Sequence, residues 1–576
     1  MYSNIKNVQY LVAALKSYNI NKIVISPGNS HNAIVRSIEE DDFFETYSIV
    51  DERSAAFFAC GIAQELNQPV AICCTAGTAA SNYLSGVTEA FRRNLPLVVI
   101  TADKHPYFLN QNEDQMIDQM SMFDTVTKCN KSLPEIENSI DQWYCQRLLN
   151  ETLLELDHNG VGPIHINVPI TKGMFAIGDD FNTVELPKFN RIYRHILKNS
   201  KENWREIFEY LIGKKVLFIC GQDYHIKQEE IKCFEKIFEK YNCIFAVDKI
   251  SNIHCEGAIE ISRAVRSMGN RSAFTKPDIV ISLAGNTALD YKFYLKNANI
   301  EHWIVDNSGK IADPFKSLKR VFEGDLIDFL NEMLKYGDSA ADNEYFNSWK
   351  ACYDDFKMPE FEYSNIYSLE KLLNNLPKNS NLNIGNSTNI RLAQYFDIDP
   401  SVQIYCNRGV NGIDGCVSTF IGQAAVSPEK INYLVVGDLT FFYDMNSIWN
   451  HYVGSNVRIM MNNNEGAALF HFNQGLEKYP TLNENVAAEH FAKAKGWVES
   501  QGFKYLSASN KEEFDENLKE FLATDCDKPI FFEVFTKKEQ DAKLQKEFYE
   551  KVAIYDARSA AVKLAKKTIK KVLGRN

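Results

Sequence analysis

The sequence predicts an α/β protein built from three tandem αβα domains with mostly parallel sheets. Short apolar runs rich in β-branched residues alternate with helical patterns along most of the chain, which is typical of βαβ units. Two polar segments, around residues 178–191 and 337–343, interrupt this alternation. The chain has 576 residues, which is too long for one hydrophobic core and suits about three domains of ordinary size.

The polar breaks set the expected domain boundaries. We expect a first domain at residues 1–180, a central domain at 190–336, a third domain at 345–555 and a basic tail at 556–576. Because no Gly-x-Gly-x-x-Gly follows the first strand of the central domain, a dinucleotide there is disfavoured. The expected strands are residues 22–26, 70–74, 97–101, 216–220, 244–247, 279–282, 303–305, 382–384, 402–405, 433–436, 457–461 and 529–534.

The composition excludes several classes of protein. Hydrophobic residues make up 45% and charged residues 24% of the chain, and no run reaches the roughly 18–20 apolar residues of a membrane span. Residues 1–6 lack the basic and apolar segments of an export signal. The 13 cysteines include no Cys-x-x-Cys pair. We therefore expect a reduced, cytoplasmic protein, and the net charge of −12 argues against nucleic-acid binding.

The basic tail differs from the rest of the chain. Its apolar residues share one helical face, and lysines surround the remainder. Such a segment suits peripheral contact with an anionic membrane or docking on a partner protein. A solvated terminal helix is the simpler alternative. The apolar face consists of Val562, Ala565, Ile569, Val572 and Leu573.

Two strand ends in the third domain carry oxygen-bearing side chains. The strand at 433–436 ends in Gly437-Asp438, and the strand at 457–461 runs into Asn462–Asn464. Carboxylate and amide oxygens suit Mg²⁺, which shares its coordination sphere with phosphates. Either feature alone is compatible with an ordinary turn or loop. Together, at this spacing, they resemble the diphosphate-binding signature of thiamine-diphosphate enzymes.

A carboxylate in the first domain is the candidate partner for the ring of such a cofactor. Glu52 lies between a strand end and an apolar helix, within the segment Val50–Gly61. Asp51 and Glu52 also suit the positive end of that helix, so this segment alone favours a structural role. Thiamine diphosphate needs a protein carboxylate beside its aminopyrimidine, and Glu52 is placed to supply it.

Further motifs fall in order through the first and third domains. They are Ser26–Gly28, Asp51–Phe58, Thr75–Ala80, Thr101–Asp103, Gln115–Gln119, Gly385–Ser387, Arg391, Asn407–Gly409, Gly412–Gly415 and Gly437-Asp438. Together they resemble the 2-succinyl-5-enolpyruvyl-6-hydroxy-3-cyclohexene-1-carboxylate synthase family, thiamine-diphosphate enzymes of menaquinone biosynthesis. The resemblance extends over about residues 10–540, is weak in the central domain and is absent in the tail.

The resemblance implies thiamine diphosphate and Mg²⁺, with Mn²⁺ as an alternative, as cofactors. Glu52 would be the catalytic carboxylate, and the metal ligands would be the side chains of Asp438 and Asn463 and the backbone carbonyl of Glu465. The family usually has glycine in place of Glu465, a change that a carbonyl ligand tolerates. The two halves of such a site come from different subunits, which implies a homodimer or a dimer of dimers. The other implied cofactor contacts are Gly77, Thr78, Gly412, Leu439 and the apolar wedge Ile413.

The family's donor substrate is the 2-oxo acid 2-oxoglutarate, whose distal carboxylate needs fixed cations. Arginine suits this role because its guanidinium makes two-point contacts with a carboxylate. Arg391 and Arg408, with Ser387, occupy the matching positions. An ordinary ion pair is the simpler interpretation of any single arginine, but three matches in register favour a donor pocket.

The acceptor side departs from the family. The loop Ser26–His31 lacks an arginine that the family has, Lys104 replaces another, and a lysine–arginine pair has no clear counterpart at residues 286–292. Isochorismate carries two carboxylates, so these losses should weaken its binding. His31 and His105 are new polar groups, either proton relays or, more commonly for loop histidines, solvated side chains. The implied acceptor-side residues are Asn29, Ser30, Lys104 and the catalytic Gln115, and Leu469 and Phe470 are implied substrate contacts.

We therefore expect a thiamine-diphosphate- and Mg²⁺-dependent 2-oxo acid decarboxylase and carboligase that uses 2-oxoglutarate and an acceptor other than isochorismate. The alternative is the authentic synthase of menaquinone biosynthesis. A non-catalytic scaffold is a third hypothesis, against which the intact Glu52, Asp438 and Asn463 argue. A flavin-containing enzyme similar to acetohydroxyacid synthase is disfavoured, because the donor arginines suit a dicarboxylic substrate.

Overall fold

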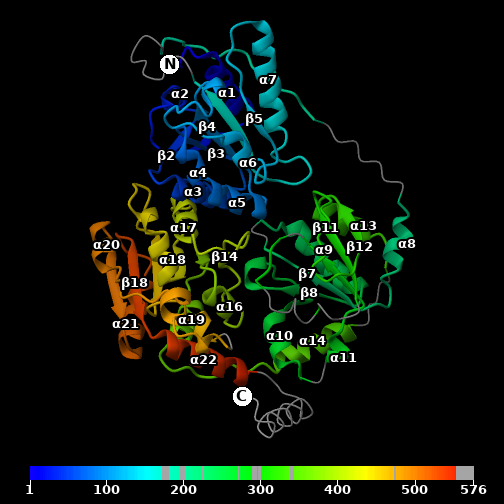
Figure 1. The fold of residues 1–576 in the computed structure, drawn as a ribbon. Helices are drawn as coiled ribbons and strands as arrows, with labels where there is room; N and C mark the ends of the chain where they lie inside the picture. The colour runs from blue at the N-terminus through cyan, green and yellow to red at the C-terminus, as the bar shows by residue number, and fades with distance from the viewer. Residues whose placement is uncertain are drawn as a thin grey trace.

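The computed structural model describes residues 1–170, 181–194, 202–222, 225–269, 272–283, 285–288, 295, 300–337, 343–472 and 475–552. These residues form three six-stranded sheets in which neighbouring strands run parallel, which confirms the predicted fold class. The first domain lies above the other two in Figure 1, with the central domain at the right and the third at the left. The predicted basic tail lies outside the described residues.

The first sheet has the strand order β2-β1-β3-β4-β6-β5. Its strands are β1 Lys22–Ile25, β2 Glu45–Ser48, β3 Val70–Cys74, β4 Leu97–Asp103, β5 Asn130–Ser132 and β6 Ile164–Pro169. The central strands β3 and β4 are buried along their whole length, as their continuous apolar sequence requires. The helices are α1 Lys6–Ser17, α2 Asn32–Glu39, α3 Glu52–Leu66, α4 Thr78–Asn82, α5 Leu84–Arg93, α6 Gln119–Phe123 and α7 Ser139–Leu153.

The central sheet has the order β12-β11-β10-β7-β8-β9. Its strands are β7 Val216–Ile219, β8 Cys243–Val247, β9 Ala258–Glu260, β10 Ile279–Ser282, β11 Glu301–Asp306 and β12 Leu318–Glu323. The described helices of this region are α8 Trp204–Glu209, α9 Gln228–Lys240, α10 Ile261–Ser267, α11 Ser272–Thr275, α13 Leu326–Met333 and α14 Glu344–Asp354.

The third sheet has the order β14-β13-β15-β16-β18-β17. The chain passes from β13 to β14 on one side and then crosses to β15 on the other, so the loops after β13 and β15 diverge. Ligands of open parallel sheets bind at this kind of switch point, outside the carboxyl ends of the strands. The strands are β13 Asn381–Ile384, β14 Gln403–Tyr405, β15 Asn432–Gly437, β16 Val457–Asn463, β17 Lys504–Ala508 and β18 Ile530–Phe535.

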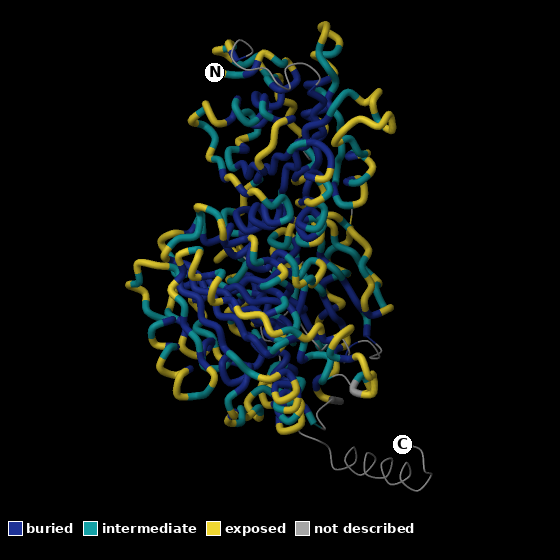
Figure 2. The backbone as a smooth tube through the Cα atoms, turned by 60° about the vertical axis from the view of Figure 1, so that its left-hand side comes forward, coloured by how far each residue is buried: buried dark blue, intermediate teal, exposed yellow. Residues whose placement is uncertain are grey.

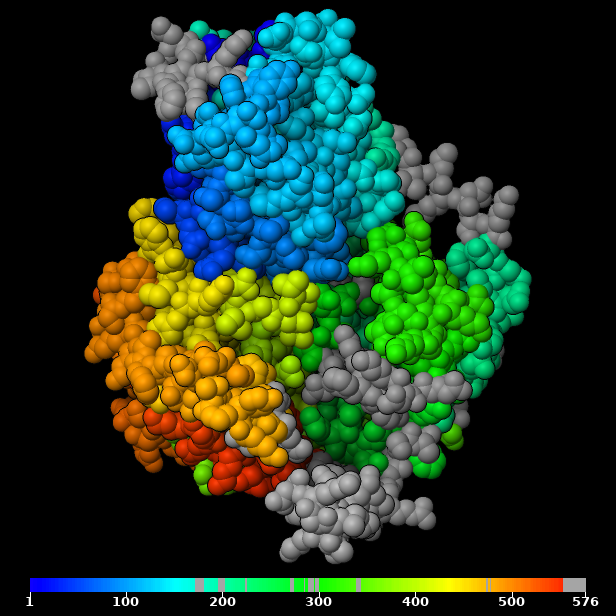
Figure 3. Space-filling view, in the orientation of Figure 1, coloured from blue at the N-terminus to red at the C-terminus, as the bar shows by residue number. Residues whose placement is uncertain are grey.

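Helices cover the third sheet, and one of them packs against the first domain. They are α15 Asn365–Leu373, α16 Thr388–Ala393, α17 Cys416–Ala425, α18 Asp438–Tyr443, α19 Ala468–Phe472, α20 Lys495–Ser500, α21 Lys511–Phe521 and α22 Lys538–Lys551. Helix α17 crosses α3 of the first domain at the junction visible in Figure 1. The space-filling view shows the first domain seated directly against the yellow part of the third (Figure 3).

The crossing of α3 and α17 brings the two backbones into contact. A Cβ atom on Gly61 would lie 2.0 Å from the carbonyl oxygen of Thr419, and one on Gly422 would lie 2.1 Å from that of Phe58. One hydrophobic core includes residues of both helices, among them Phe58 and Phe420. Buried segments accordingly lie on both sides of the junction (Figure 2), so the two domains are packed as a continuous unit.

Two further features of the structure concern the state of the cysteines and the lengths of the helices. All 13 cysteines are free thiols, and most of them are buried. No helix of the described residues is both long and apolar enough to cross a membrane.

Candidate active site

The loops after β15 and β16 form the centre of the candidate site. Gly437 pairs with Asn462 across the two strands, so the strands end side by side. Asp438 is buried, and its carboxylate accepts hydrogen bonds from the backbone N–H groups of Leu439 (2.6 Å), Asn464 (3.1 Å) and Gly466 (3.0 Å). These three donors compensate the buried charge and hold the carboxylate at the strand ends.

The side chain of Asn463 is oriented by a buried glutamate on β18. Its Nδ2 donates to Glu533 Oε1 at 2.7 Å and to the carbonyl of Ala492 at 3.0 Å. A carboxylate only accepts hydrogen bonds, so the amide nitrogen must face Glu533 and the amide oxygen must face the opposite way. Asn463 Oδ1 is therefore directed into the loop, where it accepts the N–H of Glu465 at 3.3 Å.

Glu465 turns the loop, and its side chain pairs with a lysine. Its φ of 64° lies in the left-handed region, which disfavours a residue with a side chain. The carboxylate pairs with Lys537 at 2.9 Å, and the backbone carbonyl accepts the N–H of His490 at 3.3 Å. This placement is compatible with a metal ligand that is a carbonyl, as the sequence implies for Glu465.

These oxygen donors fit a hard divalent cation. One carboxylate, one amide oxygen and one carbonyl leave room for the phosphate oxygens that Mg²⁺ prefers. The described residues contain no group of three His, Cys, Asp or Glu side chains that could hold a metal, so a metal here depends on amide and carbonyl oxygens. His490 Nε2 lies 3.2 Å from Asp438 Oδ2, and this contact raises the pKa of His490.

The loops after β13 and β14 carry the candidate donor residues, in the same sheet whose strands β15 and β16 end at the candidate metal loop (residues 438–439 and 463–466, called the metal loop below). Ser387 begins α16 with a φ of 72°, a strained conformation of the kind that clusters at functional sites. Asn386 donates to the carbonyls of Asn407 (2.6 Å) and Gly412 (2.7 Å) and accepts from Arg408 Nη1 at 3.0 Å. Arg391 lies exposed on α16. One asparagine thus links the Arg408 loop to the loop of the predicted apolar wedge.

The predicted wedge is partly exposed. Ile413 is 37% exposed. Gly415, two residues later, has a φ of 72° and lies against the ring of Phe57 on α3, where a Cβ would clash. The loop therefore presents an apolar side chain outward from a fixed base.

The predicted pyrimidine-binding residues lie at the carboxyl edge of the first sheet. Asp51 is the N-cap of α3, accepting from the N–H groups of Arg53 (3.0 Å) and Ser54 (3.3 Å). Asp51 therefore makes the N-cap hydrogen bonds, and the half-buried Glu52 is the acidic residue of the first turn of α3. Glu52 Oε2 accepts from Asn82 Nδ2 at 3.3 Å.

Gly77 and Thr78 form a tight turn next to Gln115. Gly77 has a φ of 85°, and a Cβ there would lie 3.1 Å from the backbone of Gln115, so this turn requires glycine. The Gly77 N–H donates to the buried Gln119 at 2.9 Å. Thr78 and Gln115 are both exposed. The structure thus brings Gln115 and the turn together, a contact that the sequence alone does not predict.

The other predicted substrate contacts differ in how far they are buried. Asn29 is exposed, and Leu469 and Phe470 are half-buried on α19. Ser30, in contrast, is buried and bonded to Thr75 and to the N–H of Ala76.

Lys104 and His31 are more constrained than their loop positions suggest. Lys104 Nζ lies 2.6 Å from Glu113 Oε1 and 2.6 Å from the carbonyl of Asp114. His31 is completely buried, and neither ring nitrogen makes a hydrogen bond of normal geometry among the described residues. Burial lowers the pKa of His31 to about 4. The solvated interpretation is therefore wrong for His31, because its ring is buried in the folded protein.

The structure adds positioning residues that were not among the predicted site residues. Asn386 and Gln119 lie inside motifs that the sequence already singles out, so their polar character was visible there. Glu533 is a lone acid in the apolar strand β18, which is itself a signal of a buried polar contact. Its partner Asn463 is 70 residues away, and only the fold brings the two together.

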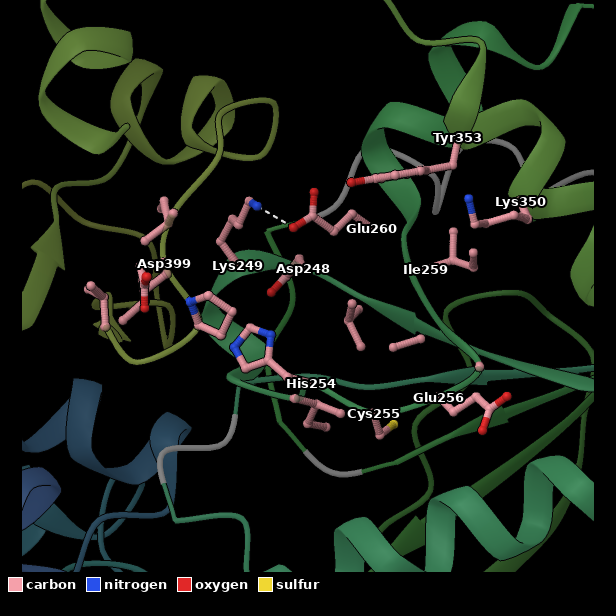
Figure 4. Close-up of a pocket in the computed structure, with 18 of the residues that line it drawn as sticks. Asp248, Lys249, His254, Cys255, Glu256, Ile259, Glu260, Lys350, Tyr353 and Asp399 are labelled. Carbon is pink, nitrogen blue, oxygen red and sulfur yellow. Dashed lines mark hydrogen bonds and ion pairs between the residues drawn. The ribbon is translucent and has the colours of Figure 1, made fainter. Parts of the chain in front are cut away.

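A cavity of about 410 Å³ lies between the central and third domains and shares no lining residue with the candidate site (Figure 4). The two lysines in its wall already have partners in the protein. Lys249 pairs with Glu260, as the dashed line in Figure 4 marks, and Lys350 lies 2.6 Å from Asp354. These charges are satisfied without a ligand.

Comparison with known families identifies the class of protein. The N-terminal TPP binding domain of thiamine pyrophosphate enzymes matches residues 5–122, and the C-terminal TPP binding domain of the same enzymes matches residues 383–534. These segments contain the turn at Gly77 and the metal loop at Asp438. The chain is a thiamine-diphosphate enzyme, and its cofactor is thiamine diphosphate with a divalent metal.

Full-length relatives identify the family. A protein of Phocaeicola vulgatus is 38% identical over 95% of this chain and 99% of its own length, and one of Bacteroides thetaiotaomicron is 36% identical over 95% and 99%. A protein of Bacteroides fragilis is likewise 36% identical over 95% of this chain. All three are named 2-succinyl-5-enolpyruvyl-6-hydroxy-3-cyclohexene-1-carboxylate synthase. The chain belongs to this family.

Proposed function

We propose that the protein forms 2-succinyl-5-enolpyruvyl-6-hydroxy-3-cyclohexene-1-carboxylate by decarboxylating 2-oxoglutarate and joining the remaining succinyl unit to isochorismate. One observation carries the proposal: Asp438, Asn463, Arg391 and Arg408 all follow strands of one sheet, β13 to β16, in a chain that matches its relatives over 99% of their length. The relatives' names favour this reaction over the different acceptor that the altered loops predict.

We assign the cofactor contacts to residues of two domains. Asp438, Asn463 and the Glu465 carbonyl would hold the metal, and Glu52 would bind the aminopyrimidine next to Gly77 and Thr78. Gly412, Ile413 and Leu439 complete the proposed contacts. Bound thiamine diphosphate supplies the carbanion chemistry, and these residues orient it and exclude water.

The donor would be held by residues at β13 and β14. Arg391 and Arg408 suit the distal carboxylate of 2-oxoglutarate, and Ser387 adds a hydroxyl close to them. The Asn386 bond to Arg408 Nη1 at 3.0 Å supports this role, because it fixes one end of the guanidinium.

The acceptor would meet Asn29, Gln115, Leu469 and Phe470. Lys104 and Ser30 remain proposed contacts, although each already has a partner in the structure. The pairing of Lys104 with Glu113 favours a second candidate function, in which the same donor is transferred to a less anionic acceptor.

We further propose an assembly and a location. The pyrimidine and diphosphate halves of the site would come from different subunits of a homodimer or a dimer of dimers, in the cytoplasm. The domain boundaries at residues 180, 190, 336, 345 and 555 stay predictions.

Growth of a bacterial host that lacks its own synthase tests the proposal. The gene for the wild-type chain should restore menaquinone-dependent growth, and the Glu52→Gln variant, expressed to the same level, should not. Failure of the wild-type chain, with cofactor binding intact in the purified protein, would exclude isochorismate as the acceptor and favour the second candidate.

A further inference from the structure

The loop that carries Arg408 is held on both sides by one helix of the first domain. Glu89 on α5 is buried, and its two carboxylate oxygens accept the N–H groups of Gly409 and Val410, each at 2.9 Å. These are the two residues that follow Arg408. Both oxygens of one side chain are therefore used to fix the loop immediately after the arginine.

Arg93, one helical turn after Glu89, fixes the loop on the other side. Its Nη1 donates to Asn407 Oδ1 at 2.9 Å, and its Nε lies 4.0 Å from Glu89 Oε1. Both side chains are almost completely buried, at 2% and 1% exposure. The pair thus contacts the residue before Arg408 and the two residues after it.

The close fit at Gly409 supports the same conclusion. A Cβ on Gly409 would lie 2.8 Å from Glu89 Oε2 and 2.9 Å from the Glu89 backbone oxygen. The loop therefore approaches α5 more closely than any residue with a side chain would allow. Such contact keeps the backbone on both sides of Arg408 in one position.

The sequence around Arg408 does not point to Glu89 or Arg93, because both residues precede Arg408 by more than 300 residues. We propose that Glu89 and Arg93 are positioning residues for Arg408, through which the first domain sets the fit of the donor site to a dicarboxylic 2-oxo acid. The inference rests on the proposed function, since it requires Arg408 to bind the distal carboxylate of the donor.

The position of a guanidinium matters because two-point contact with a carboxylate depends on orientation. If the loop were less rigid, Arg408 would still be present, but its guanidinium would no longer be held in one orientation. Binding of a dicarboxylate should then weaken, whereas a 2-oxo acid without the distal carboxylate should be unaffected. A merely structural role would affect both substrates alike.

The experiment compares CO₂ release from 2-oxoglutarate and from 2-oxopentanoate, which has the same carbon number and no distal carboxylate, by the holoenzyme. In Glu89→Gln, one of the two loop N–H groups loses its acceptor, because the amide nitrogen that replaces a carboxylate oxygen can only donate. We expect the KM for 2-oxoglutarate to rise about tenfold, with a smaller change in kcat. The kinetics with 2-oxopentanoate and the Kd for thiamine diphosphate should stay at wild-type values.

A double variant separates positioning from general damage. In an Arg408→Met background, Glu89→Gln should cost nothing further with 2-oxoglutarate, because the group it positions is gone. Gly409→Ala, which presses on Glu89 from the loop side, should reproduce the selective rise in KM if Glu89→Gln does not fold. Equal losses with both substrates, or additive losses in the double variant, would overturn the inference.

The same data show whether the proposed function itself has failed. A wild-type enzyme that does not prefer 2-oxoglutarate to 2-oxopentanoate, together with an Arg408→Met variant that behaves like wild type, would overturn the donor assignment and this inference with it. A preference that depends on Arg408 but not on Glu89 would overturn the inference alone.

Discussion

Asn463 illustrates how a single side chain is prepared for a metal. An amide presents a nitrogen and an oxygen of similar size, and only the oxygen can serve as a ligand. The buried Glu533 accepts from Nδ2 at 2.7 Å and also binds Tyr505 at 2.8 Å. The orientation of Asn463 is thus built into the protein before any ion arrives.

Glu533→Gln should weaken Mg²⁺ binding, because a glutamine can also present its own amide nitrogen to Asn463. We expect a loss of about 10–100-fold in Mg²⁺ affinity, as is typical of residues that orient metal ligands. Titration of Mg²⁺ in the presence of thiamine diphosphate, followed by tryptophan fluorescence, measures this. The exposed Glu512→Gln on α21 is the matched control. Wild-type affinity in Glu533→Gln would contradict the orienting role.

Asp444 is a buried carboxylate whose protonation affects the stability of the folded protein. It accepts from the N–H and the hydroxyl of Ser418, each at 2.7 Å, but burial outweighs these bonds and raises its pKa to about 7. Among nearby charges, Arg53 lowers this pKa and Asp51 raises it. The unfolded chain ionises near the usual value of 3.8, so it binds fewer protons than the folded chain between these values.

Because the pKa of Asp444 differs between the folded and unfolded chains, its contribution to stability depends on pH. The contribution of Asp444 to folding is complete below about pH 4 and is lost as the pH rises to about 7. In Asp444→Asn this dependence is absent, so the Tm of the variant relative to wild type should increase between about pH 5 and about pH 8. Thermal unfolding checks this, with the exposed Asp42→Asn as control. A difference in Tm that is constant or decreases over this range would refute the assignment.

At the scale of elements, the crossing of α3 and α17 is the tightest described contact between the first and third domains. Gly61→Ala would place a methyl group 2.0 Å from a backbone carbonyl, so the helices must separate. We expect a loss of about 1–3 kcal/mol in the free energy of unfolding, measured by chemical denaturation. Gly496→Ala in α20, where a Cβ meets nothing within 4 Å, should be neutral or slightly stabilising. Equal effects of the two substitutions would argue against close packing at the crossing.

Strands were predictable from sequence where they are buried, and less so at the sheet edges. The expected runs at 22–26, 70–74 and 279–282 match β1, β3 and β10 to within a residue. The strands β2, β5, β9, β12 and β17 were not predicted, and all of them lie at an edge. An edge strand pairs on one side only and carries more polar residues, which weakens the apolar signal. β6 is an interior exception, since His165 and Asn167 interrupt it.

Prediction of the site from sequence is also limited, but for a different reason. Asp438, Asn463 and Gly77 are recognisable because their chemistry depends on local turns and strand ends. The state of Ser30 or His31 depends on contacts with distant residues, such as Thr75, 45 positions away from Ser30. Local sequence therefore identifies the functional groups, and only the tertiary fold determines which of them already have partners.

For the whole molecule, the proposed sharing of the site between subunits has a direct consequence. Glu52 belongs to the first domain and Asp438 to the third, so Glu52→Gln and Asp438→Asn damage different halves of a site. In a mixed dimer of the two variants, one site carries both substitutions and the other carries neither. Mixing the two inactive proteins under conditions of subunit exchange should restore measurable CO₂ release. Continued inactivity, with exchange verified by tagged subunits, would place both halves in one chain.

CO₂ release from 2-oxoglutarate, with thiamine diphosphate and Mg²⁺ present and with or without isochorismate, tests the central claim most directly. The proposed function predicts slow release alone, strong stimulation by isochorismate and a new product with the mass of the succinylated acceptor after loss of CO₂. Release that isochorismate leaves unchanged would contradict the proposed acceptor, and no release at all would contradict the assignment of the donor.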